Sequence, residues 1–128
     1  MLGRYLLALA GVLVCAAGPA AAVEDADLNY DTTEDLYQVC STPADQPEHA
    51  AADFACRAFI EATAQYHDEV TGRKNMKRLI CYPATATVAD GQAAFVSWAN
   101  ANKDNAKLMG EQPVIGVVRA LAAKFPCR

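Results

Sequence analysis

The residues whose types could carry out chemistry are five cysteines and two histidines. An imidazole acts as a general base only when a partner lies within hydrogen-bond reach. His49 and Asp53 stand four residues apart, which is the spacing that places two side chains on one face of a helix. His67 falls beside the apolar positions of the same stretch. We interpret His49 and Asp53 as a surface pair and His67 as a histidine at the edge of the core, and we predict no catalytic residues.

The cysteines favour disulfides over metal binding. Four of them form an even set, and the sequence puts 15, 24 and 45 residues between successive members, Cys40, Cys56, Cys81 and Cys127. Zinc sites are usually built from closely spaced pairs of cysteine or histidine. An even number of cysteines in an exported chain is typical of a disulfide framework, and bridged cysteines leave no thiolate. Because the chain also lacks a phosphate-binding loop or a dinucleotide motif, we predict no metal, no cofactor and no enzymatic activity.

The first 22 residues predict a secretory signal peptide. Arg4 precedes the apolar run Leu6–Cys15, Gly18 and Pro19 interrupt that run, and three alanines end at Ala22. This order of a positive start, a short apolar segment and small residues is typical of a cleavable leader. Lipidation of Cys15 is the alternative, although the residue before it, Val14, fits that cleavage poorly. We therefore expect export to the periplasm, with no membrane span left after cleavage.

The mature chain is expected to be one domain with an uneven charge. Residues 23–31 read as a flexible acidic N-terminus and residues 32–128 as the folded domain. Residues 23–69 hold twelve acidic residues and one basic residue, a balance of −11, whereas residues 70–128 hold three acidic and nine basic residues, a balance of +6. The net negative charge argues against nucleic acid as the main partner, because binding phosphates requires a basic face. The acidic half is either a solvated surface or a patch for a basic partner.

The periodicity predicts an all-α fold of about four helices. A capping box formed by Asp31 and Glu34 would start a helix at about residue 32, and this helix would end at Cys40. A long helix follows, and Thr87 with Asp90 three residues later would begin a third that runs to about residue 102. Pro113 opens the last helix. The apolar residues of these stretches recur every three or four positions, which is typical of helices packed on one side. They are Ala52, Cys56, Phe59, Ile60, Thr63, Tyr66 or His67, Val70, Phe95, Val96, Trp98, Ala99, Val114, Val117, Val118, Leu121 and Phe125.

Three motifs in order resemble a known family. They are a cysteine followed by a small residue, an aromatic residue and isoleucine (Cys56–Ala62), a Cys-x-Pro turn (Cys81–Pro83), and a closing Phe-Pro-Cys (Phe125–Cys127). With the upstream Cys40, this pattern is similar to that of the Rap/Tai family of periplasmic immunity proteins. The resemblance implies a small helical protein that binds and blocks a type VI secreted peptidoglycan amidase by occluding its catalytic cleft.

The disulfide pairing and the contact residues are further inferences. Four cysteines allow three connectivities. We favour a Cys56–Cys81 disulfide together with a Cys40–Cys127 disulfide. The second disulfide would join the first helix to the chain end. If a protruding element enters the partner's cleft, we nominate the polar linker after the third helix, with these contact residues: Asn100, Asn102, Lys103, Asp104, Asn105 and Lys107.

Some alternatives stay open at this point. The chain could instead be a free-standing envelope protein that acts as a stress chaperone, and it could act as a monomer or as a homodimer. Trp98, the sole tryptophan, reads as core rather than as a binding hot spot. The basic stretch Arg73–Arg78 reads as a solvated linker rather than as a contact patch.

Overall fold

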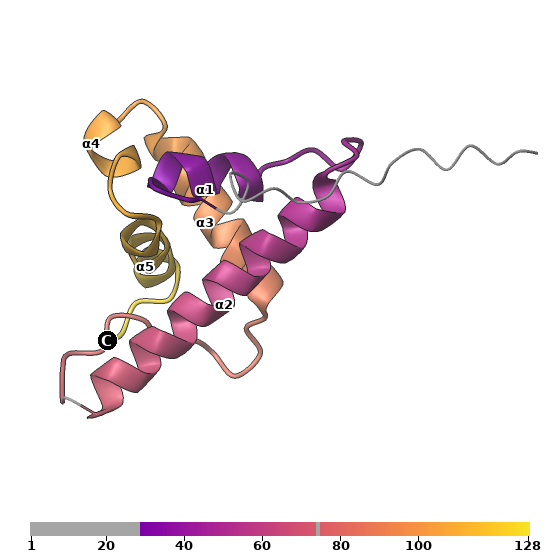
Figure 1. Ribbon diagram of the computed structural model, residues 1–128. Helices are drawn as coiled ribbons and strands as arrows, with labels where there is room; N and C mark the ends of the chain where they lie inside the picture. The colour runs from indigo at the N-terminus through magenta and orange to yellow at the C-terminus, as the bar shows by residue number, and fades with distance from the viewer. Residues whose placement is uncertain (1–28, 74) are drawn as a thin grey trace, which may run out of the picture.

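The computed structural model describes residues 29–73 and 75–128. The predicted signal peptide, Cys15 and most of the acidic N-terminus lie outside the described residues. Within the described ranges the chain forms five helices and no strand, so the all-α prediction is confirmed. The helices are α1 (Thr33–Cys40), α2 (His49–Arg73), α3 (Val88–Asn102), α4 (Ala106–Met109) and α5 (Pro113–Lys124) (Figure 1). The four-residue α4 is the element that the sequence did not predict.

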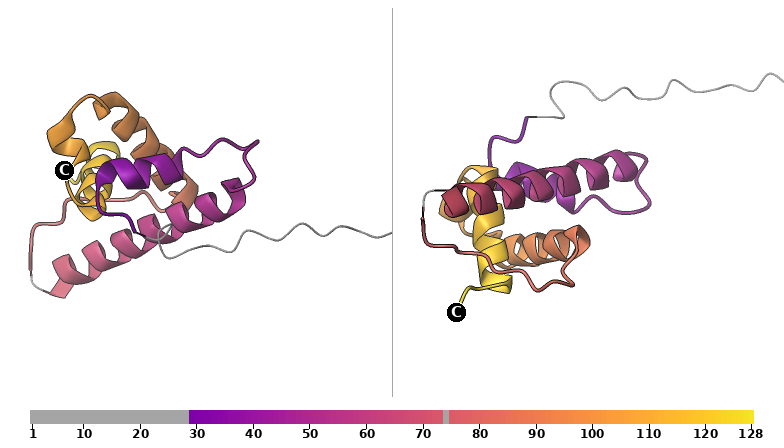
Figure 2. Two further views of the ribbon diagram at one scale, coloured as in Figure 1. Left: turned by 45° about the horizontal axis from the view of Figure 1, so that its top comes forward. Right: turned by 90° about the horizontal axis from the view of Figure 1, so that it is seen from below.

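The long helix α2 is the scaffold of the molecule. Figure 1 shows it crossing the length of the fold, with α1 and α5 to one side of it and α3 passing behind it. The helix α1 packs against both α2 and α5, and α3 packs against the same two helices. The second half of α2 extends past α1 towards the connection to α3 (Figure 2). The bundle therefore encloses one core between α2 and the other helices.

The core is made from one face of each main helix. Leu36, Cys56, Phe95 and Val117 are fully buried, with exposed fractions of 0%. The predicted choice between Tyr66 and His67 is resolved, because His67 is buried and Tyr66 is 69% exposed. Phe59 and Trp98 are only partly buried against the core. Val114, which the sequence placed on the buried side of the last helix, is 36% exposed, so that prediction is wrong.

Two helices begin at reciprocal capping boxes. At α3 the Thr87 hydroxyl accepts a hydrogen bond from the Asp90 amide, and the Asp90 carboxylate accepts one from the Thr87 amide. This box confirms the prediction for the third helix. At α1 the box is formed by Thr32 and Asp35, one residue later than the predicted Asp31 and Glu34. Threonine and aspartate three residues apart satisfy the same two amide donors, so neighbouring positions compete for the role.

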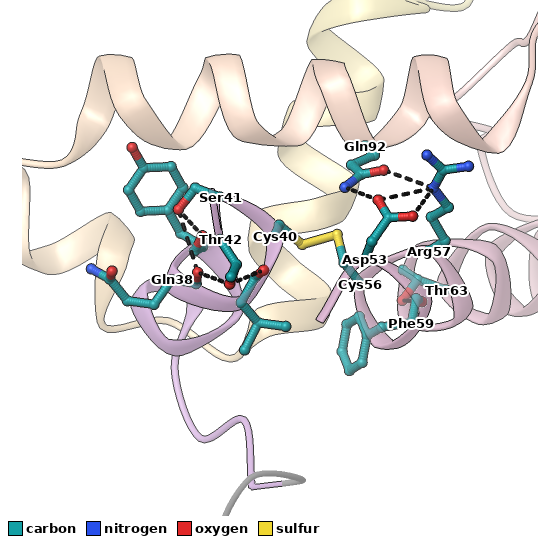
Figure 3. Close-up of a disulfide and its surroundings, with 12 residues drawn as sticks. Gln38, Cys40, Ser41, Thr42, Asp53, Cys56, Arg57, Phe59, Thr63 and Gln92 are labelled. Carbon is teal, nitrogen blue, oxygen red and sulfur yellow. Dashed lines mark hydrogen bonds and ion pairs between the residues drawn. A yellow bond between two sulfur atoms is a disulfide. The ribbon is translucent and has the colours of Figure 1, made fainter. Parts of the chain in front are cut away.

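The predicted disulfide pairing is wrong. The bond from the first helix joins Cys40 to Cys56, with their Cα atoms 5.1 Å apart (Figure 3). Cys40 ends α1, and the short connection to α2 brings the first turns of that helix back alongside it. Cys56 therefore meets Cys40 and is not available to Cys81. The closed loop spans 16 residues, instead of the much longer loop expected from a bond between Cys40 and Cys127.

The second disulfide joins Cys81 to Cys127. The segment before α3 pairs with the end of the chain, since Ile80 and Pro126 form an isolated antiparallel bridge. The Cys81 amide also donates a hydrogen bond to the Phe125 carbonyl at 2.8 Å. This backbone pairing places Cys127 opposite Cys81. The cysteine near the chain end does fasten that end, although to the α2–α3 connection and not to the first helix.

Candidate partner-binding site

The residues considered for catalysis have structural partners. The Nδ1 atom of His49 lies 2.8 Å from the Thr42 carbonyl oxygen. Asp53 instead accepts hydrogen bonds from Gln92 on α3 and from Arg57 (Figure 3). The hydrogen bond from Gln92, aided by Arg57, lowers the pKa of Asp53. His49 and Asp53 therefore bind different groups and do not form an acid–base pair.

His67 connects α2 to the segment that precedes α3. The Leu79 amide donates to Nε2 of His67 at 3.3 Å, so the ring proton sits on Nδ1, which faces the Asp68 carboxylate at 3.1 Å. Arg78 forms a salt bridge with the same carboxylate at 2.9 Å. With both ring nitrogens engaged and the side chain buried, His67 holds the connection in place and is not free to act as a base.

The predicted contact residues lie in and on both sides of the turn between α3 and α4. Asn100 and Asn102 lie in the last turn of α3, and Asn105 begins α4 by accepting a hydrogen bond from the Leu108 amide. The Asn102 side chain donates to the Trp98 carbonyl at 2.7 Å, and Asn100 accepts a hydrogen bond from Tyr37 on α1. Asn102 and Asn105 therefore fix the two ends of the turn, and Asn100 joins α3 to α1.

The charged residues of this turn point outwards. Lys103 and Asp104 sit between the two helices, Lys107 lies in α4, and all three are exposed. The connection is short, because the Asn105 amide donates to the Asn102 carbonyl at 2.8 Å. The α3–α4 turn, residues 103–105, is thus a compact polar projection on a fixed base, where the sequence suggested a longer linker.

A shallow apolar groove adjoins this turn, and the sequence did not predict it. The groove has a volume of about 450 Å³ and combines residues of α3, α4, α5 and the segment before α3. We call it the α5 groove, and its lining residues are Leu79, Trp98, Leu108, Val118, Arg119 and Ala122. Trp98, expected in the core, is half-buried and forms part of this surface.

Charge at the groove is fixed by an ion pair. Arg119 donates to both carboxylate oxygens of Glu111, from Nε at 2.7 Å and from Nη2 at 2.8 Å. The hydrogen bonds from Arg119 lower the pKa of Glu111, and the nearby charge of Lys107 lowers it further. A paired arrangement of this kind holds the guanidinium in one orientation. The guanidinium at the edge of the groove is therefore ordered, and its charge is balanced by Glu111.

The described residues hold neither a candidate metal cluster nor a free cysteine thiol. Among the described residues no group of three or more histidine, cysteine, aspartate or glutamate side chains could hold a metal ion. The four cysteines at positions 40, 56, 81 and 127 are all in disulfides. Across the same described ranges, no helix has the length and apolar character needed to cross a bilayer. Over the described residues, the fold is that of a small, disulfide-stapled helical protein.

Comparison with known proteins identifies the family. Residues 32–127 match the family model described as Rap1a immunity proteins, so the chain belongs to that family. No curated protein and no solved structure gives a significant match to the chain. The matched segment covers all five helices and both disulfides. Membership confirms the predicted resemblance, and it implies that the chain binds a protein effector.

Proposed function

We propose that this immunity protein is exported to the periplasm, where it neutralises a type VI secreted peptidoglycan amidase by covering the catalytic cleft. The observation that carries the proposal is the family match over residues 32–127. Two disulfides support an oxidising compartment such as the periplasm, because structural disulfides are rare in the cytosol. The predicted signal peptide points to the same location.

The α3–α4 turn is our proposed inhibitory element. Its outward side chains include Lys103 and Asp104, and its backbone is anchored by Asn102 and Asn105. An element that is already ordered loses little conformational entropy on binding. A compact polar projection can fill a cleft and exclude substrate without undergoing a reaction. No cofactor is needed for this mode of inhibition.

Inhibition by turn variants tests the proposal. The purified chain should bind the type VI amidase of the same cells and stop its hydrolysis of peptidoglycan at an equimolar ratio. Lys103→Glu combined with Asp104→Lys conserves the net charge and the exposed character of the turn, and should weaken inhibition at least about tenfold. Lys124→Glu, at the exposed end of α5, is the control and should inhibit like the original chain.

The results separate three cases. If the amidase is inhibited by the original chain and the control but not by the turn variant, both parts of the proposal hold. Full inhibition by the turn variant would move the inhibitory element elsewhere. An amidase that neither binds the original chain nor loses activity in its presence would refute the proposed target.

A further inference from the structure

The helix α5 has an unusually apolar outer face. Its sequence, PVIGVVRALAAK, holds only two charged residues in twelve. Gly116, Val117, Ala120 and Leu121 are buried towards the core. Ile115, Val118, Arg119 and Ala122 follow at the spacing of a second face. A helix on the surface of a protein normally turns charged and polar residues outwards. The outer face of α5 thus has the composition of a surface that another molecule covers.

This outer face forms one wall of the α5 groove. Val118 and Ala122 contribute from α5, Trp98 from α3, Leu108 from α4 and Leu79 from the segment before α3. Leu79 is 47% exposed and Ile115, beside the groove on α5, is 41% exposed. An apolar cavity of about 150 Å³ can hold a benzene molecule. At about 450 Å³, the groove is large enough to accept a bulky apolar side chain together with part of its neighbours.

The edge of the groove is positively charged. Arg119 lines the groove itself, Lys107 precedes Leu108, and Lys77 lies two residues before Leu79. Among the described residues Lys77 and Lys107 form no salt bridge, and Lys107 is near enough to Glu111 to affect its pKa. Residues 70–128 contain only three carboxylate side chains, and one of them, Glu111, is already paired with Arg119. The positive charge at this edge that is not balanced by a salt bridge therefore comes from Lys77 and Lys107.

We propose that the α5 groove binds an acidic segment of the effector protein, with a bulky apolar side chain inserted between Trp98 and Leu79 and flanking carboxylates at Lys77 and Lys107. This inference rests on the proposed function, because it assigns a second contact to the same partner. The apolar insertion supplies affinity by removing surface from water, and the charges supply orientation and faster association. The α3–α4 turn and the groove adjoin at Trp98, whose carbonyl holds Asn102.

A second copy of the chain is a poorer occupant. In a two-fold dimer the same patch contacts itself, so the two cationic edges would face each other. Like charges placed together across an interface oppose association. An acidic partner segment meets no such penalty. The charge of the edge therefore selects between these two occupants.

Trp98 makes the inference testable without the amidase. It is the only tryptophan and it lines the groove, so its fluorescence reports occupancy directly. The probes are two short synthetic peptides that share leucine and phenylalanine positions and differ only in having glutamate or lysine between them. The glutamate peptide should change Trp98 emission and bind at least about tenfold more tightly than the lysine peptide. Added salt should reduce this preference.

Matched variants locate the binding. Leu79→Glu should abolish the response to the glutamate peptide, whereas Phe54→Glu, at a 75% exposed position on α2, should leave it unchanged. Lys107→Glu should weaken binding by about 3- to 10-fold, and Lys124→Glu should change it by less than about twofold. Circular dichroism of each variant checks the fold.

Equal binding of the two peptides, or no response to either of them, would overturn the inference. A change in Trp98 emission with protein concentration alone would also overturn it, because it would indicate that a second copy of the chain occupies the groove. Amidase inhibition is measured separately on the same variants. If Leu79→Glu inhibits as the original chain does, the groove assignment fails while the proposed function stands. If the amidase is not bound at all, the proposed function fails and the peptide titration still decides what the groove accepts.

Discussion

The contact between α5 and the start of α1 should tolerate no added methyl group. A Cβ atom built at Gly116 would lie 2.5 Å from Oγ1 and 3.0 Å from Cβ of Thr33, and would contact its Cγ2 as well. Thr33 is fully buried, its amide donates to the Glu111 carbonyl at 2.7 Å, and its hydroxyl donates to the same carbonyl at 3.0 Å. Thr33 therefore cannot move away without losing these hydrogen bonds.

Gly116→Ala is expected to lower the free energy of unfolding by up to about 2 kcal/mol. Overpacking a well-packed core typically costs about 1–3 kcal/mol, and a gain of about 1 kcal/mol in helix propensity offsets part of that cost. For a domain of this size each kcal/mol corresponds to a change of roughly 4–8 °C in the melting temperature. Gly72→Ala, in α2, is the matched control, since apart from its chain neighbours and the backbone of its own helix turn no heavy atom lies within 4 Å of the added Cβ. It should be neutral or stabilise by up to about 1 kcal/mol.

Urea unfolding of both variants, of Thr33→Ala, and of Gly116→Ala combined with Thr33→Ala measures the effect. Removing Oγ1 and Cγ2 of Thr33 relieves the two closest contacts, so the double variant should be less destabilised than the sum of the single variants, by about 1 kcal/mol or more. If Gly116→Ala and Gly72→Ala shift the unfolding midpoint in the same direction, the packing argument at Thr33 is wrong.

Three further predictions concern the disulfides and two titrating groups. A non-reducing peptide map should recover Cys40 with Cys56 and Cys81 with Cys127. The chain-entropy model predicts that replacing both Cys81 and Cys127 by serine lowers the free energy of unfolding by about 4 kcal/mol, because that disulfide closes a 46-residue loop, whereas opening the 16-residue loop should cost about 3 kcal/mol. Equal losses for the two disulfides would count against this model. Hydrogen bonds from Thr87 lower the pKa of Asp90, and a carboxyl group with a lowered pKa stabilises the fold only while the pH stays above the pKa of that group in the unfolded chain. The urea midpoint should therefore fall as the pH drops below about 4, and it should fall less in Asp90→Asn. An identical acid profile for the two proteins would contradict this prediction. Burial, with the nearby charge of Asp68, raises the pKa of Tyr82 to about 12, so stability should decline as the pH rises from about 10 to 12. Tyr82→Phe should make that decline smaller, and an unchanged decline would contradict the assignment. Because the Tyr82 hydroxyl is buried without a hydrogen-bond partner in the described structure, this variant should also be at least as stable at neutral pH, and a loss above about 1 kcal/mol would refute the reasoning.

Helix positions followed from local chemistry, which explains why they could be predicted. Thr87 and Asp90 specify a helix start through their own side chains, and Pro113 opens α5 at a position where its missing amide proton has no effect. The shift of the first box to Thr32 and Asp35 shows the limit of this reasoning, since adjacent residues offered equivalent caps. The short α4 has too few residues to produce a recognisable period.

Pairings between distant residues could not be predicted in the same way. The choice of Cys56 as partner of Cys40 depends on how the connection between α1 and α2 turns back, which no periodic pattern records. Trp98 and Leu79 look like ordinary apolar residues in sequence, and only the packing of four separate segments makes them line one groove. The outer face of α5 was the available signal, because Ile115, Val118 and Ala122 leave Arg119 as its one charged residue.

The most direct test of the account is the rate at which the type VI amidase of the same cells cleaves peptidoglycan when the purified, oxidised chain is added. We expect the rate to fall in proportion to the chain added and to reach background at an equimolar ratio, with a stable complex on gel filtration. The turn variant Lys103→Glu with Asp104→Lys should require a large excess for the same effect. An unchanged rate at a large excess of the original chain, with no complex formed, would contradict the central claim.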